Sequence, residues 1–206
     1  MTTTGTMRRA WRVPTALVAL TMVPVIAGAV RVGQLAGGTV TPEDARFAAA
    51  PVPVVLHIVG ATVFCLLGAF QFVPGLRGHR WHRLAGRVVI PCGLVAALSG
   101  LWMTLFYPQP PGDGELITLL RLVFGTGMAV ALVLGLMAVR GRDFRTHRAW
   151  VIRGYAIGQG AGSQAVTSGL WTAFAGVPGE TTRALLIGAG WVINLAVAEW
   201  IIRERR

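Results

Sequence analysis

Long apolar stretches alternate with short polar segments along the whole chain. A helix rises about 1.5 Å per residue and the hydrocarbon layer of a bilayer is about 30 Å thick, so some twenty apolar residues span it. Six stretches reach that length, at about 13–32, 52–73, 82–106, 116–139, 149–173 and 183–202. Only helices and closed barrels satisfy their backbone hydrogen bonds in lipid. The pattern therefore predicts an all-α integral membrane bundle of six transmembrane helices, a single domain over residues 1–206.

The charges differ in sign between alternate connections. The chain has 19 arginines and no lysine, and its net charge is +11. The N-terminus, the segments around 77–87 and 140–153, and the C-terminus hold 15 of these arginines, whereas the other connections hold five of the eight acids. Cytoplasmic loops of membrane proteins carry the excess of arginine. We therefore expect both termini on the cytoplasmic side.

The first stretch allows a second interpretation. A basic start, an apolar segment and the small residues Ala27–Ala29 also resemble a secretory signal with its cleavage site. We favour an uncleaved first helix, because two cytoplasmic termini require an even number of spans. Either Met1 or Met7 could be the true start.

Composition excludes several classes of protein. Charged residues make up 13% of the chain, against roughly a quarter in soluble domains. The arginines lie in short turns between apolar segments, which argues against nucleic acid as a partner. Cys65 and Cys92 fall inside apolar stretches, so we expect neither a disulfide framework nor a cysteine zinc site. The sequence has no hydrolase motif, phosphate loop or dinucleotide fingerprint, and no acidic cluster for a metal.

Ionisable residues inside the spans form two layers when their depth is counted along the helices. Such residues are costly in lipid and usually face the interior of the bundle. The inner layer, near the cytoplasmic side, contains Arg87, Arg153 and Glu199, with His82, His147 and Gln71 at its rim. The outer layer contains His57, Arg121 and Gln164.

Glu199 is the one acid in an inner half-span, at a depth comparable to that of Arg87 and Arg153. We expect it to form an ion pair with one of these arginines. The alternative is that both guanidinium groups extend to anionic headgroups at the membrane surface.

His82 and His147 begin two different spans on the same side of the membrane. Two histidines at equal depth on separate helices could ligate one b-type haem. They could instead relay protons, bind a phosphate together with their neighbouring arginines, or simply line a basic turn. His57 has no second histidine in its layer.

Several of these motifs together resemble a bacterial family of predicted membrane proteins that is catalogued as a domain of unknown function. The resemblance runs from about Leu56 to Glu199 and depends on His57, Gly68–Phe72, His82-Arg83, Gly86-Arg87 and Arg142–Arg153. It implies a multi-pass protein of a bacterial plasma membrane, without assigned activity. A looser similarity is to six-helix transmembrane cytochromes b, in which histidines on the central helices hold two haems. Here the fourth span has no histidine, so the similarity implies one haem at most.

Three functions remain open at this point. The first is an uncharacterised membrane protein whose basic cytoplasmic face binds anionic lipid headgroups or a small anionic ligand. The second is a single-haem electron-transfer protein that uses His82 and His147. The third is a small proton-linked carrier, which requires a continuous polar cavity between the two layers.

Overall fold

The computed structural model describes residues 3–38, 41, 45–76 and 79–204, with side chains from Trp11 onward. Five residues that entered the charge count above lie outside the described residues: Glu43, Asp44, Arg77, Arg205 and Arg206. All regular elements of the described chain are helices, as the sequence predicts. Its elements are α1 Thr3–Ala36, α2 Ala45–Ala49, α3 Pro51–Ala69, the 3-10 turns Phe70–Phe72 and Pro74–Leu76, α4 Arg80–Phe106, α5 Glu115–Arg140, α6 Phe144–Gly158, α7 Gly160–Ala175 and α8 Glu180–Arg203.

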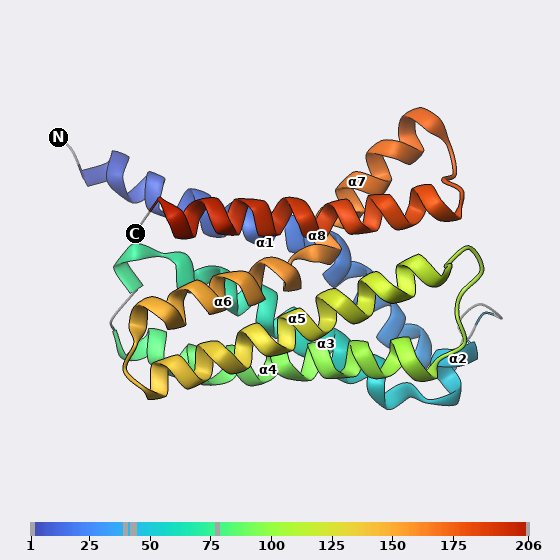
Figure 1. The fold of residues 1–206 in the computed structure, drawn as a ribbon, viewed down its shortest axis with the longest axis horizontal. Coiled ribbons are helices and arrows are strands. Elements are labelled where there is room, and N and C mark those ends of the chain that lie inside the picture. The colour runs from blue at the N-terminus through green and yellow to red at the C-terminus, as the bar shows by residue number, and fades with distance from the viewer. Residues whose placement is uncertain (1–2, 39–40, 42–44, 77–78, 205–206) are drawn as a thin grey trace.

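Five helices of the described chain are long and apolar enough to cross a membrane. They coincide with five of the six predicted spans and include residues 11–36 of α1. The most extensive contacts join α3 to α4 and α5 to α6. The start of α1 and the end of α8 lie at the same end of the bundle, with the α5–α6 turn beside them (Figure 1). We call this the basic end. The opposite end holds α2, the 107–114 loop and the 176–179 turn (Figure 1); we call it the cavity end.

The predicted span 149–173 is not one continuous helix. It consists of α6 and α7, separated at Gln159, and α7 turns away from the line of α6 (Figure 1). Glycines at 158 and 160 weaken the helix on either side of the break. The buried Gln159 donates a hydrogen bond to the Tyr155 hydroxyl at 2.7 Å, and its Oε1 lies 3.1 Å from the hydroxyl of Thr21 on α1. These side-chain bonds fix the break against α1.

The core fills the middle of the bundle. Phe64 is 1% exposed and Leu132 is fully buried. Phe64 fits because it lies between two glycines: a methyl group built on Gly93 or Gly158 would lie 2.6 or 2.5 Å from its ring. The Tyr155 hydroxyl donates to the Cys65 carbonyl at 2.6 Å. The buried core residues are Phe64, Cys65, Val89, Ile90, Ala97, Met128, Leu132, Tyr155 and Ile157.

Candidate ligand cavity

A cavity of about 380 Å³ opens at the cavity end between α3, α4, α5, α7 and α8. Its mouth is formed by Arg46 and by Pro108–Pro110 of the α4–α5 loop. Its inner wall is formed by the core side chains Phe64 and Met128 together with Gly158. The lining is mainly apolar and contains a few polar groups, as is usual for small-molecule sites.

His57 of α3 is one of these polar groups. Its Nδ1 lies 2.8 Å from the Ala96 carbonyl of α4. A carbonyl only accepts, so Nδ1 carries the hydrogen. The other ring nitrogen, Nε2, is then an acceptor in the neutral ring and a donor in the protonated ring. Gly100 leaves room for the ring, because a methyl group there would lie 3.2 Å from it. The α3–α4 contact thus fixes the orientation of His57.

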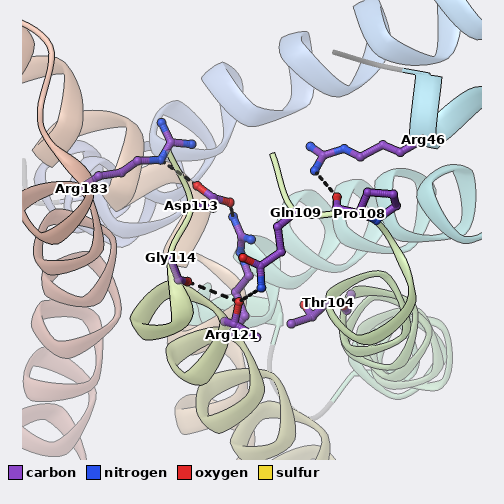
Figure 2. A network of polar contacts seen from close by, with 10 residues as sticks. Arg46, Thr104, Pro108, Gln109, Asp113, Gly114, Arg121 and Arg183 are labelled. Atoms are coloured by element: carbon purple, nitrogen blue, oxygen red, sulfur yellow. Dashed lines mark hydrogen bonds and ion pairs between the residues drawn. The ribbon is translucent and has the colours of Figure 1, made fainter. Parts of the chain in front are cut away.

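Arg121 supplies the charge in the cavity wall. It lies between the second and third turns of α5, and its Nη2 is 2.7 Å from Oδ2 of Asp113. The Asp113 side chain is fully buried, and its Oδ1 accepts a hydrogen bond of 2.9 Å from Nε of Arg183 on α8. One carboxylate therefore holds two arginines from different helices (Figure 2). Gly112, with φ of 81°, allows the turn that directs Asp113 inward.

Hydrogen bonds also order the mouth of the cavity. Arg46 donates to the Pro108 carbonyl at 3.1 Å, and Gln109 donates to the Thr118 hydroxyl at 2.7 Å (Figure 2). The Tyr107 hydroxyl donates to the Ala50 carbonyl at 2.5 Å, and burial raises the pKa of Tyr107. The mouth therefore keeps a defined shape.

The structure brings His57, Arg121 and Gln164 together around this one cavity. Counting depth along the helices placed the same three residues in one layer. Between this cavity and Glu199 lies the apolar core, including the fully buried Leu132. The described cavity therefore does not continue to the other layer, as a carrier path between them requires.

The basic end is packed differently. Arg153 of α6 and Glu199 of α8 form a two-pronged ion pair, with Nε to Oε1 at 2.5 Å and Nη2 to Oε2 at 3.0 Å. The Arg153 guanidinium also lies 4.8 Å from the ring centre of Trp150. Arg87 is exposed on α4. Of the two arginines expected near Glu199, Arg153 is the one that the structure joins to it.

His82 and His147 are half-buried at the basic end. His147 Nδ1 lies 2.8 Å from the Gly135 carbonyl oxygen of α5. The other ring nitrogen, Nε2, takes no part in this contact. Neither histidine lines the cavity described above. Within the described part of the chain, no group of three or more His, Cys, Asp or Glu residues is placed to hold a metal ion. Haem ligation by these histidines stays a prediction.

Comparison with known proteins gives one match. The family model "Predicted membrane protein (DUF2306)" matches residues 54–202. The chain belongs to this family. Neither the curated proteins nor the solved structures give a match. Family membership supports a membrane protein with several apolar helices and carries no activity with it. The match includes every lining residue of the cavity except Arg46 and Phe47 of α2.

Sequence reasoning missed two features of this family member. Asp113 was counted as a loop acid, although it is the buried link between α5 and α8. The turn sequence Pro-Gly-Asp-Gly gave a signal for a tight loop, but none for an inward side chain. Gln159 lies within the predicted span 149–173, and its neighbouring glycines were the available signal for the helix break.

Proposed function

We propose that this membrane protein binds a small ligand that has an anionic group and an apolar body, in the cavity at the cavity end. The supporting observation is the combination of Arg121 and His57 in a largely apolar wall. No aspartate or glutamate is among the described residues of that wall. Arg121 is already paired with Asp113, which is not part of the lining, and the lining adds no second carboxylate beside a bound anion.

The chemistry of the wall favours a carboxylate or a similar flat anion. A guanidinium binds such groups through two parallel hydrogen bonds. Asp113 already holds Arg121 at a fixed position, so little side-chain entropy is lost when a ligand binds. The apolar part of the ligand lies against Phe64, Met128 and Trp191. The ring of Trp191 is stacked on Phe124, with 4.7 Å between ring centres.

The topology we propose places this cavity on the outer side of a bacterial plasma membrane. In this arrangement α6 and α7 together make the fifth of six crossings, so that both termini lie on one side. The arginine-rich basic end then faces the cytoplasm, as the positive-inside rule requires. Anionic lipid headgroups around that end would be attracted by charge alone.

Binding of hexanoate and of hexanol, which have the same chain length, tests the proposal. Calorimetry on the purified protein in amphipol should give at least about tenfold tighter binding of hexanoate, the scale of one charge-assisted hydrogen bond. Arg121→Gln should remove this preference. Arg87→Gln, which neutralises an exposed arginine at the basic end, should keep it. Equal binding of hexanoate and hexanol would overturn the proposal, as would a preference that survives in a folded Arg121→Gln variant.

A further inference from the structure

A second cavity lies beside the first and faces the bilayer. Its volume is about 480 Å³, and it is a groove between α1, α7 and α8. Small side chains form most of its floor, including Ala27 of α1 and Ala165 and Ser168 of α7. Its outer end is formed by the 176–179 turn and Arg183. Val23 of α1, which lines the groove, is 60% exposed and lies within a candidate membrane span, so the groove opens into lipid.

One layer of side chains separates this groove from the first cavity. Ala161, Gln164 and Ile187 line both. The Gln164 amide donates a hydrogen bond of 3.2 Å to the Ile187 carbonyl and so closes the wall between α7 and α8. The acceptor of this bond is a backbone oxygen, which stays in place when side chains move. A change in the side-chain rotamer of Gln164 is therefore enough to break the bond.

The charges on the two sides of the wall are linked. Arg121 lines the first cavity and Arg183 lines the groove, and both bind Asp113 (Figure 2). The Arg183 side chain is 43% exposed and the Arg121 side chain is 34% exposed, whereas the Asp113 side chain is fully buried. Asp113 thus contacts both guanidinium groups, and the Glu180 carboxylate lies against Gly114 of the same loop, where an added methyl group would lie 1.7 Å from its Oε1. The parts of Arg121 and Arg183 that stay exposed can contact an anionic headgroup.

We infer that the ligand is a single-chain anionic amphiphile taken from the surrounding leaflet. Its headgroup lies beside Arg121 and Arg183, and the first carbons of its chain lie in the first cavity. The rest of the chain passes Gln164 into the groove between α1, α7 and α8. This inference rests on the proposed function, because it assigns the ligand class of the same site. The small residues of the groove leave space for one chain, and the chain stays in an apolar environment throughout, so entry from the bilayer requires no passage through water.

Chain length and a groove-filling variant test the inference. In amphipol, dodecanoate should bind more than tenfold more tightly than hexanoate, because each buried methylene contributes roughly fourfold. Ala27→Phe places a large ring in the groove and should remove at least tenfold of that gain, with hexanoate binding unchanged. Ala29→Phe is the matched control: Ala29 is also exposed on α1 but lines neither cavity. It should keep the full gain.

The two possible failures are distinguishable. If Ala27→Phe binds dodecanoate as tightly as Ala29→Phe does, the chain does not occupy the groove and the inference is wrong. Hexanoate binding that depends on Arg121 would still support the proposed function in that case. If hexanoate binding does not depend on Arg121, the proposed function is wrong, and the inference that rests on it falls too.

Discussion

The two ends of the bundle use their charged residues in different ways. At the basic end, Arg153 and Glu199 bind each other through two contacts, and His147 is joined to a backbone carbonyl. At the cavity end, one buried acid, Asp113, binds two arginines, and one of these lines a cavity of about 380 Å³. The basic end has more arginines, yet the cavity lies at the other end.

The comparison shows that charge and available space carry different information. A cluster of arginines at a membrane surface is explained by orientation alone. Arg121 is different, because a buried acid holds it in the wall of a cavity, and orientation in the membrane does not require such an arrangement. The outer layer of polar residues is therefore the better candidate for binding, although the basic segment is the more conspicuous feature of the sequence.

The largest expected effect comes from removing the side chain of Phe64, which belongs both to the inner wall of the cavity and to the packed core. Phe64→Ala should lower the free energy of unfolding by about 3–5 kcal/mol, because it leaves a void in the core. SDS-induced unfolding followed by circular dichroism measures the change. Phe174→Ala, at a position that is 89% exposed, is the control and should change stability by less than about 0.5 kcal/mol. Similar losses in both variants would mean that Phe64 is not part of a tightly packed core.

A second variant examines whether the ion pair at the basic end is structural. Glu199→Ala should cost about 2–4 kcal/mol of unfolding free energy, because it leaves the part-buried Arg153 without this partner. Glu204→Ala, at the exposed end of α8, should have little effect. Hexanoate binding should remain unchanged in Glu199→Ala. A large loss of hexanoate binding in Glu199→Ala would show that the two ends are coupled and do not use their charged residues independently.

The third prediction concerns how α7, the helix shared by both cavities, is held in place. Gly162→Ala should lower stability by about 1–3 kcal/mol, because the new methyl group would lie 2.3 Å from the Leu20 carbonyl oxygen of α1. Gly169→Ala is the control on the same helix, where nothing lies within 4 Å. This control should stabilise the helix slightly, since alanine has the higher helix propensity. Effects of the same sign and size would argue against close packing of α1 on α7.

The smallest expected effect is a pH dependence at the basic end. Asp143 caps α6 by accepting a hydrogen bond of 3.0 Å from the Thr146 amide, and hydrogen bonds from Thr146 lower the pKa of Asp143. Because the folded-state pKa lies below the unfolded one, this stabilisation is full above the ordinary aspartate range. It is lost as the pH falls through the lowered pKa.

The cap prediction is measured as the pH dependence of unfolding in the wild type and in Asp143→Asn. The asparagine keeps a capping oxygen but does not titrate, so the variant should lack the loss of stability at acidic pH. Identical pH profiles in the two proteins would show that the carboxylate makes no contribution.

The sequence by itself determined the helices and the distribution of charge between the two ends. Apolar run length and turn residues are local properties, and five predicted spans coincide with long helices for that reason. Residue depth follows from the regular rise of a helix. For this reason His57, Arg121 and Gln164 could be placed in one layer before their contacts were known.

The tertiary structure alone decided the break at Gln159, the inward position of Asp113 and the existence of the two cavities. Each depends on contacts between residues far apart in the chain, such as Gln159 with Thr21 and Asp113 with Arg183. A cavity is the space that side chains from several helices leave unfilled. Its place therefore depends on how all those helices pack together, which no single stretch of sequence specifies.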